Sequence, residues 1–322
     1  MPPTLDAIIV NWNAGTHLQA CLDSLGRLPH LNYTIGRVVV VDNASTDGSA
    51  DGLRAGDLPV EVLRNGENRG FGAACNQGGG GTRSDYLLFL NPDTELFEPS
   101  VERPVAFMES ARGQDIGICG AGLIDVEGRP GFVGGRFPSL SKFGADAIGL
   151  SRLWPTRFPP LLVRLEEPDG VQEIDAVMGA FFLIRTSLFL RLGGFDQRFF
   201  MYLEDVDLSL RARELGFRSV FLGGVAVRHV GGLSSGRELA TRLFYALRSR
   251  LVYGLKHFNR LEALLLILVT VLEVGPRLVR AIWRLSWSEF TATLSAYARL
   301  AWILPGLIRR GSDPPVSIPG GR

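Results

Sequence analysis

LDAIIVN, residues 5–11, is a short run of apolar and β-branched residues that ends on the polar side chain of Asn11. Such a run predicts a buried β-strand. Apolar residues then recur with helical spacing over residues 17–25, and a second β-branched run, residues 37–42, ends on Asp42. This order of strand, helix and strand indicates the start of an α/β domain with a parallel sheet.

Polar residues follow three of the expected strands. In open α/β sheets, ligands bind in the crevice beyond the carboxyl ends of the strands. Asn11, Asp42 and Asp93 occupy such positions, so the sequence predicts that three separate strands direct polar groups to one place. Further strands are expected at residues 60–63, 86–90, 174–185 and 218–222, with a helix over residues 71–77.

Composition limits the class of protein. The chain has 322 residues, 46% of them hydrophobic, which suffices for one large domain and a smaller appendage. Its 34 basic and 33 acidic residues give a formal charge of +1, which disfavours a role in binding nucleic acid. The 3 cysteines lack a metal-ligand motif and indicate reduced thiols in a cytosolic setting, and no secretory signal is visible at the N-terminus.

The C-terminal part differs from the rest of the chain. Residues 263–272 are almost purely aliphatic, and arginines and tryptophans alternate with aliphatic residues over residues 277–287. The aliphatic run is shorter than the ~20 residues that cross a bilayer, so amphipathic helices in the membrane interface are expected. A helical hairpin packed on the α/β domain or on a second subunit would use the same apolar faces. The expected domains are an α/β domain at 1–240, a membrane-associated helical region at 241–312 and a flexible tail at 313–322.

Two stretches are unusual for a regular α/β domain. Residues 128–169 are rich in Gly, Pro and aromatic residues, which indicates a long functional loop region or, as an equal possibility, a pair of helices. Gly78–Gly81 stands where a regular helix end would be expected. These glycines are expected to shorten the helix and to loosen that edge of the ligand pocket.

MYLEDVDLSLR, residues 201–211, places acidic side chains in an otherwise apolar segment. The residues after Glu204 and Asp205 have the spacing of a helix. A carboxylate at a helix start can be ionised, oriented and partly shielded from water, as a general base requires. Helix capping, with Asp207 paired to Arg211, is an equally good explanation of the segment taken alone.

Two other segments are candidates for binding a nucleotide. VVVVDNASTDGS, residues 38–49, ends a strand on Asp42, whose carboxylate can accept bonds from a base or a ribose. The polar residues after it are also typical of turns and caps. ENRGFGAACNQG, residues 67–78, supplies Arg69 and Asn76 among small residues that let a phosphate approach the backbone.

FLNPDTEL, residues 89–96, sets Asp93 after a buried strand and behind Pro92. A divalent ion that bridges the phosphates of a nucleotide diphosphate keeps several waters and needs only one or two protein ligands. We expect Asp93 to be one of them, and His229, between a strand and a Gly/Ser turn, is a candidate for the other. An imidazole ligand favours Mn²⁺, and Mg²⁺ is also compatible.

Motifs along the chain cover most of residues 5–236 in one order: IIVNWN, VVDNASTDGS, ENRGFGAACNQG, LFLNPDTEL, VMGAFFLIR, GGFDQRFFMYLEDVDLSLR and VRHVGGLSS. The series resembles the family 2 inverting glycosyltransferases of the GT-A fold, close to their bacterial rhamnosyltransferase-like branch. The resemblance implies a mixed, mainly parallel sheet with helices on both faces. It also implies that Asp42 contacts the nucleoside and that Asp205 is the catalytic base. Asp93 and His229 would belong to a DxD-like metal site.

The resemblance also implies the substrates. The donor would be a nucleotide-diphosphate sugar, dTDP-L-rhamnose, and the acceptor a lipid-linked sugar or a cell-envelope polysaccharide. The protein would lie peripherally on the cytoplasmic face of the cell membrane, and a homo-oligomer is left open. The DxD position reads Asn91-Pro92-Asp93, so only the last acid is available and the metal is expected to be held partly by the substrate phosphates. The expected donor-binding residues are Asn11, Asp42, Arg69, Asn76, Asn91 and Asp93.

The expected reaction is a direct displacement at the anomeric carbon with inversion of configuration. Asp205, beside Glu204, removes the proton of the acceptor hydroxyl, while Mg²⁺ or Mn²⁺ and Arg69 neutralise the departing nucleotide diphosphate. Two other functions remain open. A sugar nucleotidyltransferase would release pyrophosphate, and a non-catalytic nucleotide-sugar-binding protein of the membrane surface would bind the donor without transfer.

Overall fold

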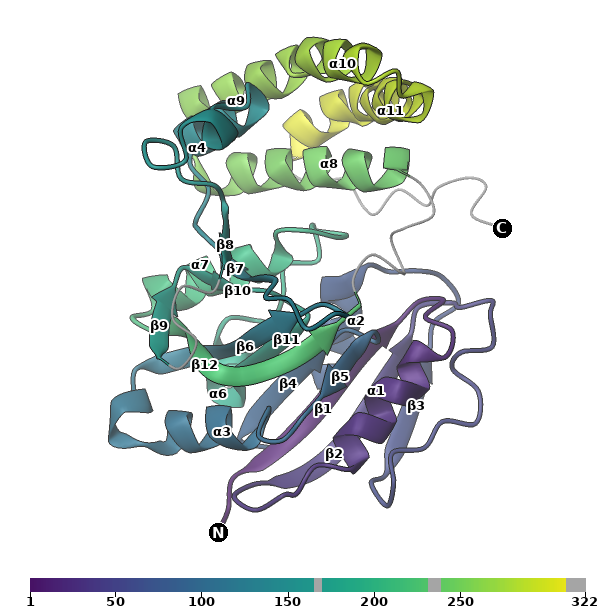
Figure 1. Cartoon of the computed structure of the whole chain (residues 1–322), viewed down its shortest axis with the longest axis vertical. Helices are drawn as coiled ribbons and strands as arrows, with labels where there is room; N and C mark the ends of the chain where they lie inside the picture. The colour runs from purple at the N-terminus through teal and green to yellow at the C-terminus, as the bar shows by residue number, and fades with distance from the viewer. Residues whose placement is uncertain (165–169, 231–238, 311–322) are drawn as a thin grey trace. The chain divides into compact units, whose positions relative to one another are not determined.

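The structure, a computed structural model, describes residues 1–164, 170–230 and 239–310 (Figure 1). The chain forms two compact units, and each is described by itself. The sheet unit comprises Met1–Phe137, Leu162–Asp196 and Asp205–Ser234, and the helical unit comprises Pro138–Leu161, Gln197–Glu204 and Ser235–Arg322.

One large mixed sheet forms the centre of the sheet unit. Its strands are β1 (Thr4–Asn11), β2 (Thr34–Asp42), β3 (Val60–Arg64), β4 (Tyr86–Leu90), β5 (Thr94–Leu96), β6 (Ile116–Ile124), β9 (Val171–Ile174), β11 (Phe181–Arg185) and β12 (Arg218–His229). Within the described residues their order is β3-β2-β1-β4-β11-β6-β12-β5, and β9 also pairs with β12. Strands β1 to β4 run parallel to one another, and β6 runs parallel to β12, whereas β11, β5 and β9 run antiparallel to the strands with which they pair.

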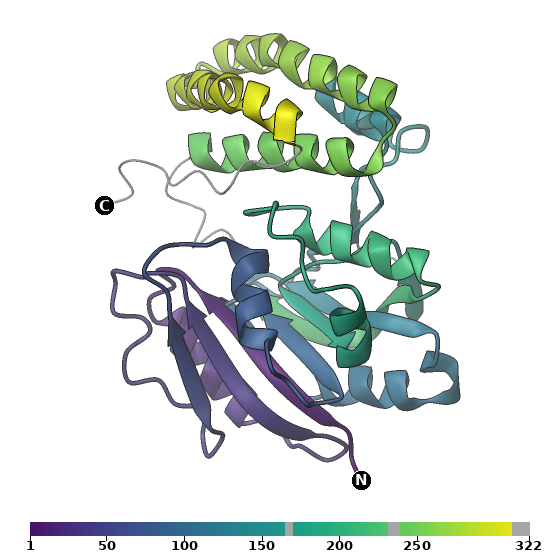
Figure 2. The same cartoon turned by 180° about the vertical axis from the view of Figure 1, so that it is seen from behind.

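Helices cover both faces of this sheet. The helices are α1 (His17–Gly26), α2 (Phe71–Gly79), α3 (Glu102–Glu109), η1 (Ala111–Gly113), α6 (Thr186–Arg191) and α7 (Glu204–Glu214). Because successive side chains of a strand point to opposite faces, Ala7 and Ile9 of β1 belong to the buried cluster that includes residues of α1 and α3, whereas Ile8 belongs to the cluster that includes residues of α2, α6 and α7. Helix α1 lies in front of the sheet in Figure 1, and α2 lies in front of it in Figure 2. The predicted α/β fold, with a mainly parallel sheet between two layers of helices, is confirmed.

Gly78 lies where α2 meets the sheet. A Cβ atom built on Gly78 would lie 2.5 Å from Cγ2 of Ile8 and 3.0 Å from Cγ2 of Val41. Glycine at this position therefore lets α2 approach β1 and β2 closely. The last turn of α2 thus packs closely on the strands, and the expected loosening of the ligand pocket at this edge stays a prediction.

The helical unit contains α8 (Leu239–His257), α9 (Arg260–Leu272), α10 (Val274–Trp283) and α11 (Trp287–Arg310), together with α4 (Leu140–Ala147) and α5 (Leu150–Leu153). Helix α8 packs against α11 and α9, and α4 packs against α9. The ring of Phe143 in α4 lies 6.4 Å from the rings of Tyr253 and Phe258. The expected division near residue 240 differs from this arrangement, because two stretches from the middle of the chain join the C-terminal helices. Among the described residues, no helix combines the length and the apolar character that a bilayer span requires.

The middle region contains regular structure where a long loop was one expectation. It forms β7 (Phe132–Gly135), α4, α5 and β8 (Leu162–Arg164), and β7 pairs with both β8 and β10 (Ala176–Val177) in a small second sheet. The alternative of two helices therefore describes it better. Residues 165–169, the predicted tail at 313–322 and the GGLSS end of the last motif, residues 231–235, lie outside the described residues.

Candidate active site

The carboxyl-terminal edge of the large sheet gathers the predicted polar residues. Asn11 ends β1 and lies opposite Asp42, which ends β2 in parallel register. Asn91 and Asp93 follow β4 at the same edge. His229 ends β12, which runs in the direction of β4 because β11 is antiparallel to both β4 and β6 and β12 is parallel to β6. Strand direction thus brings Asp42, Asp93 and His229 to one edge of the sheet.

Asn11 orients Asp42. Asn11 is fully buried, and its Nδ2 lies 2.9 Å from Oδ1 of Asp42. The same nitrogen lies 3.0 Å from Oγ of Ser45 and 2.9 Å from Oγ of Ser49. Asp42 is only 3% exposed, and Nη1 of Arg64 lies 4.0 Å from its second oxygen. The amide of Asn11 is thus engaged in holding Asp42 and the following turn, and its contact with a donor stays a prediction.

Asn91, Asp93 and His229 form a second cluster. Nε2 of His229 lies 3.1 Å from Nδ2 of Asn91 and 3.3 Å from Oδ1 of Asp93. The antiparallel pairing of β5 with β12 aligns Thr94 with His229, which sets this geometry. Asp93 is 6% exposed, and its carboxylate oxygen lies close to the ring nitrogen of His229.

This pair of atoms fits a divalent cation whose remaining ligands are phosphate oxygens and water. Carboxylate oxygen and imidazole nitrogen are both accepted by Mn²⁺, and their short separation lets one ion reach both. In the part of the chain that the structure describes, no group of three or more His, Cys, Asp and Glu side chains is arranged to hold a metal. Asp93 and His229 therefore fit a site that the substrate must complete.

Asp205 lies in the first turn of α7. Its Oδ2 accepts a 3.0 Å hydrogen bond from the backbone N–H of Gly179, and its Oδ1 accepts a 2.8 Å bond from the N–H of Val206. Burial raises the pKa of the Asp205 carboxyl above its ordinary value, although backbone N–H groups act in the opposite direction. A carboxylate that is held in place and has a raised pKa suits proton abstraction. Glu204, the first residue of α7, is 7% exposed, and its predicted catalytic role stays a prediction.

Gly179 links Asp205 to the metal-site candidates. The carbonyl of the next residue, Ala180, accepts a 3.2 Å hydrogen bond from the N–H of Asn91. Gly179 belongs to the VMGAFFLIR motif, but no individual role was predicted for it. The side-chain pattern could not reveal that role, because the group involved is a backbone N–H.

A second series of contacts runs from Gly179 towards Asp42. A Cβ atom on Gly179 would lie 3.2 Å from the ring of Phe71. The carbonyl of Gly70, the residue before Phe71, accepts a 3.2 Å hydrogen bond from Nδ2 of Asn43. Asn43 directly follows Asp42. The residues that the sequence predicted to converge therefore share this edge of the sheet unit: Asp42, Asp93, Asp205 and His229.

Asp207 has the structural role that the capping alternative described. Its Oδ2 accepts a 2.9 Å bond from Nε of Arg211, one turn later. The other nitrogens of Arg211 donate to the carbonyls of Leu192 and Gly194, at 2.8 and 2.9 Å. Asp207 is fully buried. This network fastens α7 to the preceding turn, whereas the Asp205 carboxylate has different partners.

Two predicted donor-binding residues have contrasting surroundings. Nδ2 of Asn76 donates to the carbonyl of Phe195 and Oδ1 accepts from the N–H of Phe195, both at 2.8 Å. Asn76 thus has a structural partner where a donor contact was expected. Arg69 is exposed in the loop before α2 and, among the described residues, makes neither a hydrogen bond nor an ion pair. Both donor contacts remain predictions.

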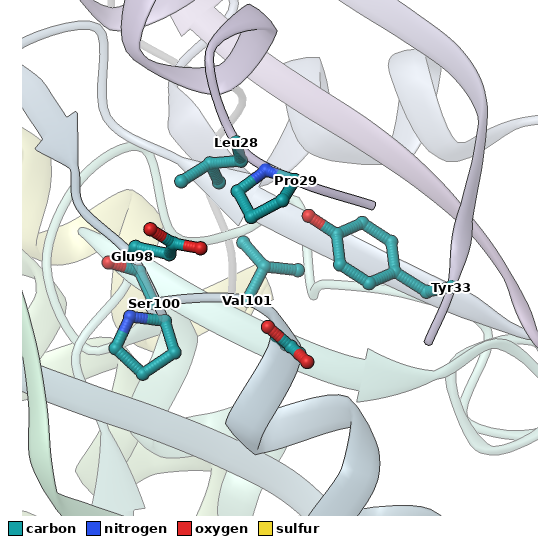
Figure 3. Close-up of a pocket in the computed structure, with 8 residues that line it drawn as sticks. Leu28, Pro29, Tyr33, Glu98, Ser100 and Val101 are labelled. Carbon is teal, nitrogen blue, oxygen red and sulfur yellow. The ribbon is translucent and has the colours of Figure 1, made fainter. Parts of the chain in front are cut away.

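A small hollow in the sheet unit has no part in this site (Figure 3). It is lined by Leu28, Pro29, Tyr33 and residues 98–102, none of which is a predicted site residue. Even with the open solvent at its mouth included, its empty space is about 140 Å³, whereas small-molecule sites usually measure about 300–1,000 Å³. The hollow is too small for a nucleotide sugar.

Known proteins resemble this chain over most of its length. Residues 6–129 match the family model "Glycosyl transferase family 2", and residues 167–251 match "Glycosyltransferase like family 2". An N-acetylglucosaminyl-diphospho-decaprenol L-rhamnosyltransferase of Mycobacterium tuberculosis (strain ATCC 25618 / H37Rv) is 30% identical over 256 residues, which cover 76% of this chain and 81% of the relative. Rhamnosyltransferase WbbL of Escherichia coli (strain K12) is 34% identical over 140 residues, which cover 42% of this chain and 48% of the relative.

Solved structures resemble the chain in fold. A mannosyltransferase from Pyrobaculum calidifontis, in complex with GDP-Man and Mn²⁺, has a TM-score of 0.55 at 14% identity, with 94% of this chain and 88% of that chain covered. GalNAc-T7 with UDP, GalNAc and Mn²⁺ has a TM-score of 0.55 at 17% identity, with 79% of this chain and 50% of that chain covered. These likenesses agree with the predicted GT-A fold.

Proposed function

Because the chain belongs to glycosyltransferase family 2, we propose that it transfers L-rhamnose from dTDP-L-rhamnose to a hydroxyl of a lipid-linked or cell-envelope glycan, with inversion. The observation that carries this proposal is the position of Asp205. Its carboxylate, held by Gly179, shares one sheet edge with Asp42 and with the pair Asp93 and His229. The rhamnosyltransferase relatives from M. tuberculosis and E. coli support the sugar, and the decaprenol-linked acceptor named for the former supports a lipid-linked acceptor.

Asp205 acts as the general base. The acceptor oxygen attacks the anomeric carbon, and its proton passes to the Asp205 carboxylate. The bond between the anomeric carbon and the diphosphate oxygen breaks, and its electron pair leaves with the nucleoside diphosphate. The Gly179 N–H fixes the carboxylate, and the raised pKa of Asp205 makes the ionised form a stronger proton acceptor. One positioned base contributes about 10²- to 10⁴-fold.

Other residues at the edge bind the donor. Asp42 accepts hydrogen bonds from the base or ribose, and Arg69 approaches the diphosphate. Asp93 and His229 would hold Mg²⁺ or Mn²⁺, which when bound neutralises charge on the departing diphosphate. The two solved neighbours with Mn²⁺ support such a cation. The protein acts peripherally at the cytoplasmic face of the membrane, where a lipid-linked acceptor is presented.

The experiment that tests this function compares Asp205→Asn with Glu214→Gln, an exposed acid at the other end of α7. Donor affinity and turnover are measured side by side, with dTDP-L-rhamnose and a polyprenyl-diphosphate-linked amino sugar as substrates. Turnover of Asp205→Asn is expected to fall about 10²- to 10⁴-fold with donor affinity retained. Near-normal turnover excludes Asp205 as the base.

The released product distinguishes sugar transfer from the two alternative functions. Transfer releases dTDP, whereas a nucleotidyltransferase releases pyrophosphate. Tight donor binding without transfer, over a panel of donors and acceptors, would indicate the non-catalytic alternative.

A further inference from the structure

Helix α9 is apolar on both sides. It buries Ala263, Leu266 and Thr270 within the helical unit. On the opposite side its large aliphatic residues recur with helical spacing and remain exposed, which a folded soluble domain has no reason to maintain. These exposed residues are Leu261, Leu264, Leu265, Leu268, Val271 and Leu272.

Helix α10 and the turn after it continue the apolar strip. The side of α10 opposite the buried Ala281 carries Val279, Ile282 and Trp283, and Trp283 is 83% exposed. Leu285 follows in the turn and is 93% exposed. Tryptophan beside aliphatic residues on one face of a surface helix is typical of the membrane interface.

The insertion α4–α5, from the middle of the chain, adds to the same unit. Helix α4 packs on α9, and Arg250 of α8 lies over the ring of Phe143. After α4, Ile148, Leu153 and Trp154 are 64%, 68% and 58% exposed. A stretch distant in sequence thus contributes a third set of exposed apolar side chains.

Four arginines gather beside this surface. Arg277, Arg280 and Arg284 follow one another at helical spacing along one side of α10. Burial, followed by the positive charges of Arg284, Arg152 and Arg277, lowers the pKa of Arg280, although the carboxylate of Glu289 acts in the opposite direction. Arg152 of α5 therefore belongs to the same group, which we call the arginine cluster.

Acidic partners reach only part of the arginine cluster. Glu273 pairs with Arg277 at 2.5 Å, and Glu289 lies 3.5 Å from Arg284. The other two arginines have no ion pair within the residues that the structure describes. Because the four arginines outnumber these two acids, their mutual repulsion raises the free energy of the folded protein unless an anion binds there.

We propose that α4–α5 and α9–α10 form one membrane-binding face, whose apolar residues enter the interface of an anionic bilayer and whose arginine cluster binds lipid phosphates. Anionic headgroups supply the missing negative charge at the depth where flanking arginines of an interfacial helix reside. A second copy of this face would instead bring four more arginines. The inference assigns a role to the central insertion and extends the peripheral attachment proposed above, but it does not depend on the transfer reaction.

Vesicle co-sedimentation of the full chain, without donor or acceptor, tests the charge requirement. Vesicles of phosphatidylcholine alone are compared with vesicles that also contain phosphatidylglycerol. Binding is expected to be stronger to the anionic vesicles and to weaken with salt. Arg152→Gln and Arg280→Gln should each lower affinity for anionic vesicles about fivefold and leave binding to neutral vesicles unchanged. Arg83→Gln, at an exposed arginine of the sheet unit, is the matched control.

Quenching of tryptophan fluorescence by brominated lipids tests the apolar contact. Trp154→Phe and Trp283→Phe should each remove part of the quenching, whereas Trp12→Phe in the sheet unit should not. Unchanged quenching in Trp154→Phe, or unchanged vesicle affinity in Arg152→Gln, would overturn the role of the insertion.

Absence of vesicle binding together with a concentration-dependent dimer in light scattering would overturn the proposal and assign the face to a second copy. Transfer to a detergent-dispersed acceptor is measured on the same variants. Vesicle binding without any transfer would leave this inference standing while the proposed function fails.

Discussion

The backbone N–H of Gly179 donates a 3.0 Å hydrogen bond to Oδ2 of Asp205. This bond ties the start of α7 to the segment that leads into β11, and so connects the helix that carries the carboxylate to the centre of the sheet. The carboxylate is oriented at a cost, because burial opposes its ionisation.

Asp205→Asn should stabilise the protein at neutral pH. The folded state raises the pKa of Asp205 above the ordinary value of 3.8, so it binds the proton more tightly than the unfolded state does. Stability is therefore lost as pH rises from 3.8 to the raised pKa, and the loss is complete above it. An asparagine does not ionise. The melting temperature of the Asp205→Asn protein should exceed that of the unaltered protein at neutral pH, and the difference should shrink as pH falls towards 3.8. Thermal unfolding at several pH values measures this, with Glu214→Gln as control; a lower melting temperature at neutral pH would contradict it.

Asn76→Asp should destabilise the sheet unit. A carboxylate still accepts from the N–H of Phe195, but it cannot donate to the Phe195 carbonyl and places negative charge beside it. The free energy of unfolding should fall by about 1–3 kcal/mol, as measured by denaturant titration. Asn68→Asp is the matched control, because Asn68 accepts a bond from Gly70 through Oδ1, which a carboxylate also does. A stable Asn76→Asp protein with greatly weakened donor affinity would favour the donor contact predicted from sequence.

His229→Gln should raise the Mn²⁺ concentration needed for half-maximal turnover. Asp93 and His229 are the proposed protein ligands, so loss of one should weaken metal affinity about tenfold or more. Chelation should abolish turnover of the unaltered enzyme, and added Mn²⁺ or Mg²⁺ should restore it. His17→Gln, at the start of α1, controls for loss of a histidine elsewhere in the sheet unit. Full activity in the presence of chelator would rule out the metal requirement.

Gly78→Ala should lower stability by about 1–3 kcal/mol, because the added methyl group would overlap with Ile8. Gly144→Ala in α4 is the matched control, since no atom lies within 4 Å of a Cβ built there. That change should be neutral or stabilise the protein by about 0.5–1 kcal/mol. Equal effects of the two substitutions in denaturant titrations would refute the close packing of α2 on the sheet.

Local patterns were sufficient to predict much of the sheet. The run at residues 86–90 became β4 at the expected bounds, because a short continuous run of leucine and aromatic residues is typical of a strand buried on both faces. The predicted end of this strand in turn indicated that Asp93 lies at the edge of the sheet. Strand direction then placed Asp42, Asp93 and His229 at one edge, as the order of elements implied.

Contacts between distant segments could not be predicted in this way. The amide of Asn76 is bonded to Phe195, 119 residues later, and no local pattern distinguishes that use from a ligand contact. The position of Gly179 was equally hidden, since its contribution is a backbone N–H. The packing of Phe143 with Tyr253 made the helical unit discontinuous, whereas composition indicated only a C-terminal extension.

Three separated stretches of chain build the helical unit. Within it, Nη1 of Arg248 and Oγ of Ser249, both on α8, donate to the carbonyls of Arg198 and Met201, at 2.8 and 2.7 Å. Deleting everything after residue 240 would strip these donors from the peptide that immediately precedes Asp205. The helical unit therefore cannot be exchanged between related enzymes by gene fusion at a single junction. Such an exchange requires three coordinated replacements, one for each stretch of chain.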